Sequence, residues 1–488
     1  MSSTCVIGAG GSGLVAAKVL LADGHDVVVL ERERQLGGVW APWRAFPGLT
    51  TQTPGAQFEF SDFAFPAGLP AWPPAADVHA YLCAYAERFG VTERIRFGSE
   101  VVGLEPEHDR SWTVVVRREG ETTRERFDRV VLSCGIFDRP VLPAIAGREA
   151  FEQAGGRVLH SAHCTDPALL ERRRVVVVGI QKTATDLAAY AAAHGSTVDM
   201  VYRRARWKLP RRFLGVVGVA AALFTRRFEA MSRLATSVPQ PTRGQRLVHR
   251  LVGRPARLQF RLVERILRAQ FRLGRAGMLP DNGVDDEAHC GITIETPGFY
   301  EALRHGAIAT HRTVVERLEP GLVVLADGER LAAETVVYAT GYRLELPFLP
   351  AAVAARIFDE DGLLRLYRNV LPPDLPTLAF VGFNSAIASP LAAEVAAHWL
   401  AAYWSGRMRL PAPAAMHAHA AAELRWRMER WPESTRGLRN ACVGLQYGYM
   451  DGLMREMGRP PKVPGLRAAM RALRPSDYAA LLDRGAGA

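Results

Sequence analysis

The chain has 488 residues, which is too long for one compact core and predicts two or three domains. Hydrophobic residues make up 48% of the sequence and charged residues 23%, and these values exclude a disordered or fibrous protein. The net charge of +11 names no partner by itself, and we expect no nucleic-acid binding. Six cysteines are scattered without a CxxC pair, so the sequence predicts reduced thiols in a cytoplasmic protein rather than a zinc site or a redox disulfide.

The N-terminal residues lack the basic region of a signal peptide. Their apolar side chains fit a strand and a glycine-rich turn instead. The longest apolar run, Phe213 to Phe224, has 12 residues and is flanked by arginines on both sides. A membrane span needs about 20 residues, so no membrane-spanning helix is expected.

The first chemical motif lies at the start of the chain. A short apolar strand ends at Ile7, the segment GAGGSG follows with glycines at Gly8, Gly10 and Gly13, and a helix pattern leads to a second strand. Glu31 ends that second strand, 23 residues after Gly8, where a carboxylate can accept a hydrogen bond from a ribose 2′-hydroxyl. The order of strand, turn, helix and acid predicts a dinucleotide site for a free ribose diol.

A second unit of the same kind begins at VVVVGIQKTATD, Val175 to Asp186. Counting the same 23 residues from Gly179 leads to Tyr202, which is followed by Arg203 and Arg204 instead of an acid. An arginine cannot accept a hydrogen bond, but its guanidinium can bind a phosphate through paired donors. The arginines therefore predict that this unit binds NADP through its 2′-phosphate.

The turn of the second unit has Gln181 where close approach of a phosphate normally favours glycine. Lys182 and Thr183 open the following helix, whose N-terminal amides favour phosphate, and the lysine adds positive charge. We therefore interpret the unit as a nucleotide site. The alternative is a nucleotide fold retained only as a scaffold, and the arginine pair argues against it.

Several segments in matching order resemble the flavin-containing monooxygenases and the related Baeyer–Villiger monooxygenases, the class B flavoprotein monooxygenases. ERERQLGGVW (31–40) looks like the acid, paired glycines and tryptophan around the FAD ribose, and SDFAFP (61–66) is similar to the family's SDFPFP segment. VYRRARWKLPR (201–211) resembles the NADP-phosphate stretch, and VVYATGY (336–342) the ATGY hallmark. The resemblance also implies cofactor contacts at further positions, namely Gly38, Val39, Trp40, Thr53, Thr340 and Gly341.

The chain departs from the family pattern at two places. In AGGRVLHSAHC the family's glycine and histidine are kept at Gly156 and His160, but Ala154 and Cys164 replace its aromatic residues. The active-site asparagine of many members falls on Gln52, which keeps both amide functions. We expect Gln52 to position the oxygen intermediate or the NADP amide, and His160 to be either an interdomain residue or a structural histidine.

The resemblance implies an enzyme that uses FAD, NADPH and O2 and inserts one oxygen atom into a small to medium apolar organic substrate through a C4a-(hydro)peroxyflavin. The reaction would be N- or S-oxygenation or a Baeyer–Villiger insertion. The alanine- and arginine-rich composition and the unusual insertion favour a role in specialised metabolite biosynthesis. One alternative is a pyridine nucleotide-dependent flavoprotein reductase, which would need a redox cysteine pair. Another is a non-catalytic nucleotide-sensing protein. The sequence does not indicate the oligomeric state.

The expected fold is α/β, with two Rossmann-like dinucleotide-binding domains and the NADP domain inserted into the FAD domain. We predict the first part of the FAD domain at 1–168 and the NADP domain at 169–335, with a helical insertion at about 213–300. Residues 336–488 would hold the second part of the FAD domain and C-terminal helices. In this scheme VVYATGY and LPTLAFVGF return to the FAD sheet and an alanine-rich helix follows.

The insertion contains a pattern typical of a basic amphipathic helix. Phe260, Val263, Leu267 and Phe271 mark its apolar stripe. The arginines that recur every three or four residues are 257, 261, 265, 268, 272 and 275. We expect this helix to pack on a core with a solvated basic face, the alternative being contact with a membrane surface. We also expect the insertion, including the run Phe213 to Phe224, to form walls of the substrate pocket.

Overall fold

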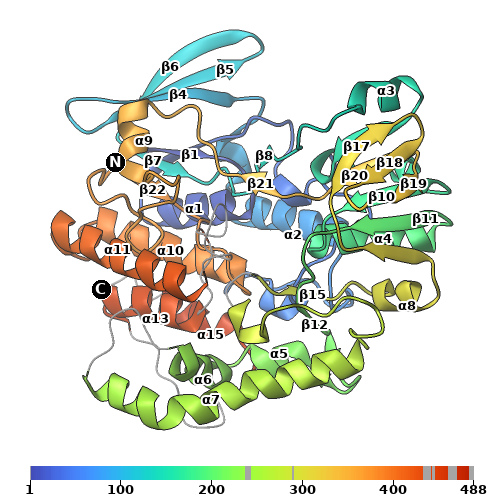
Figure 1. The fold of residues 1–488 in the computed structure, drawn as a ribbon. Coiled ribbons are helices and arrows are strands. Elements are labelled where there is room, and N and C mark those ends of the chain that lie inside the picture. The colour runs from blue at the N-terminus through green and yellow to red at the C-terminus, as the bar shows by residue number, and fades with distance from the viewer. Residues whose placement is uncertain are drawn as a thin grey trace.

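The computed structural model describes residues 2–236, 243–287, 291–431, 441, 446–459 and 470–482. Two five-stranded parallel sheets organise these residues (Figure 1). The first has the order β22-β7-β1-β2-β3. Its strands are β1 (Ser3–Ile7), β2 (Asp26–Leu30), β3 (Ile95–Arg96), β7 (Arg129–Leu132) and β22 (Leu378–Phe380). The prediction that LPTLAFVGF returns to this sheet is confirmed, because Leu378 pairs with Val130.

Helices cover one face of the first sheet. The helix α1 (Gly11–Ala22) connects β1 to β2, and the alanine-rich α10 (Ser389–Trp404) shares one buried core with it. Small alanine side chains allow these two helices to approach closely. The other helices of this part are α2 (Ala75–Arg88), α11 (Pro413–Arg430), α13 (Gln446–Glu456) and α15 (Ser476–Leu482). The expected alanine-rich helix is thus confirmed.

An antiparallel sheet of three strands covers the opposite face, at the top of Figure 1. Its strands are β4 (Glu100–Pro106), β5 (Trp112–Arg118) and β6 (Glu121–Phe127). Alternate residues of β5, beginning with Trp112, are buried against the first sheet, which is the pattern of a strand with one wet face. The short helix α9 (Ala351–Ile357) packs beside this sheet.

The second parallel sheet has the order β16-β11-β10-β20-β9. Its strands are β9 (Arg157–His160), β10 (Arg174–Val178), β11 (Thr197–Val201), β16 (Ile308–His311) and β20 (Thr335–Tyr338). The helix α4 (Lys182–Ala193) crosses from β10 to β11, with α8 (Phe299–Arg304) in the same core. On the other side lie α3 (Arg148–Gln153) and the strands β17 (Val315–Glu319), β18 (Leu322–Leu325) and β19 (Arg330–Ala332).

The strands β9 and β20 belong to a different sheet from the one that the expected domain boundaries gave them. Residues 157–160 were expected in the first part of the FAD domain and 336–338 at the return to the FAD sheet, but Val336 pairs with both Val158 and Val176 inside the second sheet. The chain passes between the two units at β8 (Arg139–Pro140) and β21 (Tyr342–Arg343), which pair antiparallel and are called the crossing below. The expectation for both strands is wrong because an apolar strand shows that it is buried, but not which sheet it joins.

The insertion forms a separate helical layer at the bottom of Figure 1. It contains α5 (Val219–Leu223), α6 (Arg226–Thr236) and α7 (Arg243–Gln270), with the hairpin β13 (Arg212–Phe213) and β14 (Val217–Gly218). The strands β12 (Lys208–Leu209) and β15 (Thr293–Ile294) join this layer to the second sheet.

The expected apolar stripe packs inward. Phe260, Leu267 and Phe271 are buried in the core of the second unit and Val263 packs against them, so the predicted packing of this helix is confirmed. The six arginines of the stripe are exposed. Within the described ranges, no helix has both the length and the apolar composition to cross a membrane.

Candidate active site

A single cavity of about 1650 Å³ connects the glycine turns of both nucleotide units with the inner face of the insertion. A pocket for one drug-sized ligand typically measures about 300–1,000 Å³, so this cavity has room for more than one ligand. Every residue expected at the site lines it except Gly13: the lining includes Gly8, Gly10, Glu31, Gly38, Val39, Trp40, Gln52, Thr53, Gly179, Lys182, Thr183, Arg203, Arg204, Thr340 and Gly341.

The first glycine turn leaves space at one glycine and none at the two others. A Cβ on Gly8, which has φ +104°, would lie 2.7 Å from the carbonyl oxygen of Ser133, and a Cβ on Gly13 would lie 1.9 Å from that of Gly8. These two glycines are needed for packing of the turn. A Cβ on Gly10 would have the Cα of Gly38 as its nearest neighbour at 3.8 Å, so this glycine leaves room for a ligand to approach the backbone.

Glu31 is held at the end of β2 with its carboxylate against the turn. Its Oε2 accepts a hydrogen bond from the Ala9 amide at 2.7 Å, and its Oε1 accepts one from the Glu33 amide at 3.0 Å. Burial raises the pKa of Glu31, while these two amides oppose the shift. Each carboxylate oxygen can accept a further bond, which suits recognition of a diol.

The segments around 40 and 52 complete this half of the cavity. Gly38 has φ +58°, and Trp40 packs edge-on against Phe58 with ring centroids 5.4 Å apart. The Oγ1 atom of Thr53 is buried and has no hydrogen-bond partner among the described residues. Gln52 is exposed in the cavity beside it. A buried hydroxyl without a partner indicates that a ligand supplies one.

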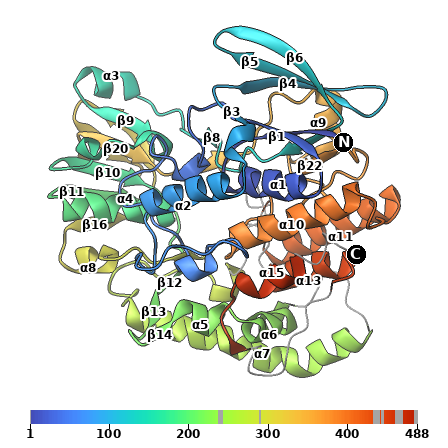
Figure 2. The ribbon, with the colours of Figure 1, turned by 180° about the vertical axis from the view of Figure 1, so that it is seen from behind.

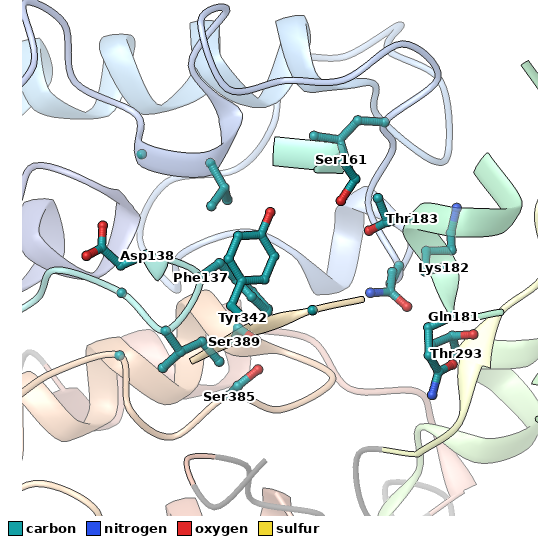
Figure 3. Close-up of a pocket in the computed structure, with 18 of the residues that line it drawn as sticks. Phe137, Asp138, Ser161, Gln181, Lys182, Thr183, Thr293, Tyr342, Ser385 and Ser389 are labelled. Carbon is teal, nitrogen blue, oxygen red and sulfur yellow. The ribbon is translucent and has the colours of Figure 1, made fainter. Parts of the chain in front are cut away.

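In the second turn, Gln181 occupies its unusual position without strain, since its φ of −75° is available to any residue. Its Nε2 donates a hydrogen bond to the carbonyl of Gly291 at 3.0 Å, which draws the side chain toward a neighbouring loop. Its Oε1 is buried without a hydrogen-bond partner in the described part of the chain. Figure 3 shows Gln181 beside Thr293 at the edge of the pocket. The glutamine therefore lines the turn and does not block it.

Lys182 does not supply the free charge that was expected of it. Its ammonium forms a buried ion pair with Asp186, one turn further along α4. Burial lowers the pKa of Lys182 and raises that of Asp186, whereas their attraction opposes both shifts. Thr296 also donates to Asp186 at 2.5 Å. The sequence showed the i, i+4 spacing of this pair, but not that both residues are buried.

Lys208 is a residue of this region that the sequence analysis did not select. Its ammonium donates to the carbonyl of Ile180 at 2.9 Å and lies 3.2 Å from the Thr293 hydroxyl, so it supports the turn from behind. Burial, followed by the charge of Lys182, lowers the pKa of Lys208 to about 7. The signal was present, since Lys208 lies in the segment VYRRARWKLPR.

Arg203 and Arg204 follow β11 after a single residue, Tyr202, and their exposed side chains line the cavity. Both turns are therefore placed alike relative to their sheets: the acid Glu31 follows the second strand of one unit and the arginines follow the second strand of the other. The two halves thus present opposite charges at equivalent positions.

The crossing between the two units lies at the centre of the cavity. Gly341 accepts a hydrogen bond from the Val141 amide at 2.9 Å, and the hydroxyl of Thr340 donates to the Val141 carbonyl. Tyr342 belongs to the ATGY motif but was not selected from the sequence. Burial raises its pKa, and the neighbouring side chains of Arg44 and Ser161 oppose this shift. In Figure 3 its hydroxyl points toward Ser161, which comes from the second unit.

His160 ends β9 and packs edge-on against Tyr342, with ring centroids 5.1 Å apart. Its Nδ1 accepts a hydrogen bond from the Ala162 amide at 3.1 Å, and burial lowers the pKa of His160 to about 4. A neutral, buried histidine that packs against the crossing is at once structural and interdomain, so the two expected roles coincide.

The insertion forms an apolar chamber on one side of the cavity, lined by Leu223, Phe224, Phe228, Phe260 and Val263. The insertion therefore lines the cavity as expected, whereas binding of the substrate at this side of the cavity stays a prediction. The expectation is wrong for part of the run Phe213 to Phe224, because Leu214, Val216 and Val217 at the hairpin tip are exposed. These residues point away because a two-stranded hairpin cannot bury its own tip.

The residues present fit two dinucleotides. One glycine turn carries a carboxylate and the other a pair of guanidinium groups, and each turn opens toward the shared cavity. The unpartnered atoms Thr53 Oγ1 and Gln181 Oε1 supply polar contacts that the protein itself leaves unmade. This arrangement suits an acid-bound ribose on one side and a 2′-phosphate on the other.

Comparison with known proteins gives the same result. The flavin-binding monooxygenase-like family model matches residues 2–471. The chain is 27% identical to dimethylaniline monooxygenase [N-oxide-forming] 2 of Rattus norvegicus, over 94% of this chain and 83% of that protein.

Two solved structures are similar in fold. One is S-allyl-L-cysteine S-oxygenase of Allium sativum, with a TM-score of 0.62, 22% identity and coverage of 94% and 88% of the two chains. The other is cyclohexanone monooxygenase with bound ε-caprolactone, with a TM-score of 0.67, 19% identity and coverage of 94% and 99%. The chain belongs to the flavin-binding monooxygenase-like family, and it is a flavoprotein monooxygenase with FAD and NADPH as its cofactors.

Proposed function

We propose that this protein inserts one oxygen atom of O2 into a small to medium apolar organic substrate held in the chamber of the insertion. The observation that carries the proposal is the cavity itself, in which two nucleotide turns of opposite charge and an apolar chamber adjoin. When bound, FAD would supply the hydride acceptor for NADPH and the centre for activation of O2. The protein must bind and orient both cofactors and keep water from the reacting centre.

Individual residues suit these tasks. Glu31 would bind the FAD ribose, with Gly10 allowing approach of the pyrophosphate and Gly38, Val39, Trp40 and Thr53 lining the same half. Arg203 and Arg204 would bind the 2′-phosphate of NADP, and the helix N-terminus at Thr183 its pyrophosphate. Lys182 would act on this helix only indirectly, by fixing Asp186. Thr340 and Gly341 would hold the crossing over the flavin.

Gln52 is the candidate for positioning the oxygen or the nicotinamide amide. Its side chain is exposed in the cavity next to Thr53, and its amide both donates and accepts hydrogen bonds. The aromatic side chains Phe224, Phe228 and Phe260 would exclude water from the substrate side.

Relatives support three types of substrate for the same chemistry: an amine nitrogen by the name of the rat relative, a sulfur by the name of the Allium structure, and a ketone by the name of cyclohexanone monooxygenase. The corresponding reactions are N-oxygenation, S-oxygenation and Baeyer–Villiger insertion, and we propose that this protein catalyses one of them. Among the described residues, four free cysteines form no pair, which argues against a disulfide reductase and supports a reducing compartment such as the cytoplasm.

The test is NADPH oxidation by the FAD-loaded protein under ¹⁸O2, with a tertiary amine, a thioether and a cyclic ketone of increasing size. A substrate of the proposed class should stimulate NADPH oxidation and carry one ¹⁸O atom in its product. If every compound left the basal rate unchanged and all oxygen were recovered as hydrogen peroxide, oxygen insertion would be excluded for these classes.

A further inference from the structure

The outer face of α7 carries a stripe of leucines that nothing in the described structure covers. Leu247, Leu251, Leu258 and Leu262 are each between 56% and 68% exposed. Their spacings of four, seven and four residues place them on one face of the helix. Exposed leucines in a row are unusual on a soluble surface and indicate an interaction site.

An arginine directly precedes each of these leucines, at positions 246, 250, 257 and 261, and all four arginines are exposed. Neighbouring residues of a helix are rotated by about 100°, so the arginines form a second stripe beside the leucines. The helix contains eight arginines against one acid, Glu264, which is itself paired with Arg268. The outer face is thus apolar along one edge and strongly basic along the other.

The orientation of α7 is fixed from its other side. Phe260 and Leu267 are buried in the core and Val263 packs beside them, so the leucine stripe cannot turn inward. At the C-terminal end, Gln270 binds the hairpin by donating to the Arg212 carbonyl and accepting from the Leu214 amide, both at 2.9 Å. Leu214, Val216 and Val217 are also exposed and add a second apolar site to the same layer. Figure 2 shows their hairpin, β13 and β14, beside α5.

We propose that this face, named here the docking face (Leu247, Leu251, Leu258, Leu262 and their preceding arginines), binds the surface of an anionic lipid bilayer. The leucines would enter the boundary between headgroups and acyl chains while the arginines contact the lipid phosphates. A second copy of the chain fits less well, because the two basic stripes would face each other. Nucleic acid would use the arginines but leave the leucines in water.

The docking face lies on the outside of the helix whose inside lines the cavity, because Phe260 and Val263 of α7 belong to the chamber wall. A bilayer on this face would bring the chamber close to the place where apolar molecules concentrate. Binding to lipid does not depend on the proposed reaction, so it can be tested by itself.

The test is flotation of the FAD-loaded protein with vesicles of phosphatidylcholine alone or with phosphatidylglycerol added. The protein should float with the anionic vesicles at low salt and remain in solution with the neutral ones. Each arginine near an anionic surface changes the partition coefficient about fivefold, so Arg257→Glu with Arg261→Glu should lower it by at least tenfold. Leu251→Glu with Leu258→Glu should lower it to a similar extent.

The matched control reverses two exposed arginines at the opposite end of the molecule, Arg118 on β5 and Arg356 on α9 (Figure 1). Arg118→Glu with Arg356→Glu changes the net charge equally and should bind vesicles almost as well as the unchanged protein. FAD content and basal NADPH oxidation verify that every variant is folded. Three results would each overturn the proposal: no flotation of the unchanged protein, equal losses in the control, or a dimer that the leucine changes dissociate.

Discussion

At the scale of single residues, the two nucleotide turns of this monooxygenase differ in the charge that follows the second strand. Glu31 stands after β2, and Arg203 and Arg204 stand after β11. Since a carboxylate accepts hydrogen bonds and a guanidinium only donates them, this difference decides between a free ribose and a phosphorylated one.

Changing Arg203 or Arg204 to alanine should therefore weaken NADPH much more than NADH. A charge-assisted hydrogen bond contributes about 1.5–3 kcal/mol, so we expect a loss of about ten- to a hundredfold in NADPH affinity. Titration of each variant with both coenzymes measures the ratio, and Arg157→Ala on β9 of the same sheet is the control. Equal losses for NADPH and NADH would refute the phosphate assignment.

The glycines of the first turn separate packing from ligand approach. Gly13→Ala brings a Cβ to 1.9 Å from a backbone oxygen and should lower the free energy of unfolding by about 1–3 kcal/mol even without FAD. Gly10→Ala has open space and an ordinary φ of −77°, so its FAD-free stability should change by about 0.5 kcal/mol or less while FAD binding weakens. Denaturant unfolding with and without FAD distinguishes the two effects. Unfolding of both variants at the same lower denaturant concentration without FAD would contradict this division.

At the scale of elements, contacts of α6 fasten the insertion to the C-terminal helices. Arg226 of α6 forms an ion pair with Asp451 of α13 and donates to the Tyr478 hydroxyl at 2.8 Å, and both charged side chains are about one fifth exposed. Glu229, one turn along, accepts from the amides of Tyr447 and Gly448 at 2.8 and 2.7 Å. The chamber wall therefore depends on contacts between segments more than 200 residues apart in the chain.

Asp451→Asn should loosen this wall, because the Arg226 guanidinium loses its anionic partner at a partly buried site. We expect a loss of about 1–3 kcal/mol in the local free energy of opening, seen as faster amide hydrogen exchange in α6 and α13. The control is Asp477→Asn, which removes the exposed pair with Arg471 and should cost about 1 kcal/mol or less. Unchanged exchange in α6 would show that the pair does not hold the insertion.

At the scale of the whole molecule, we expect ionisation of Glu394 to make the free energy of unfolding depend on pH. This side chain of α10 is buried and accepts hydrogen bonds from the amide and hydroxyl of Ser61 at 2.7 and 2.9 Å, which joins α10 to the segment SDFAFP. Burial, together with the charge of Asp62, raises its pKa from 4.5 to about 7. Between these values the folded protein holds a proton that the unfolded chain has lost.

This contribution to stability is therefore complete below pH 4.5 and is lost as the pH rises toward 7. The shift corresponds to about 3 kcal/mol in total. Glu394→Gln keeps the shape and hydrogen-bonding capacity but cannot ionise, so its free energy of unfolding should fall less steeply across this window. Urea unfolding at several pH values, with the exposed Glu360→Gln as control, measures the difference. Parallel pH curves for the unchanged protein and Glu394→Gln would rule this out.

Much of the site could be predicted because its signals are local. A turn such as GAGGSG, an acid or arginine pair at a fixed distance, and the segments 31–40 and 336–342 each report on their own few residues, and the structure brings them to one cavity. The roles of these residues toward FAD and NADPH remain predictions. The residues that were missed are Lys208, in the segment 201–211, and Tyr342, in the segment 336–342. Both segments were recognised from the sequence, but their pattern did not single out these two residues.

The sequence by itself determined the two nucleotide units, their opposite charges and the amphipathic helix in the insertion, since hydrophobic periodicity and motif spacing depend on neighbours along the chain. Only the tertiary structure decided that β9 and β20 join the second sheet, that Asp186 neutralises Lys182, and that the hairpin tip at Val216 points outward. The physical reason is that a residue's own pattern shows whether it is buried, whereas its partner is chosen by segments far away in sequence that fold against it.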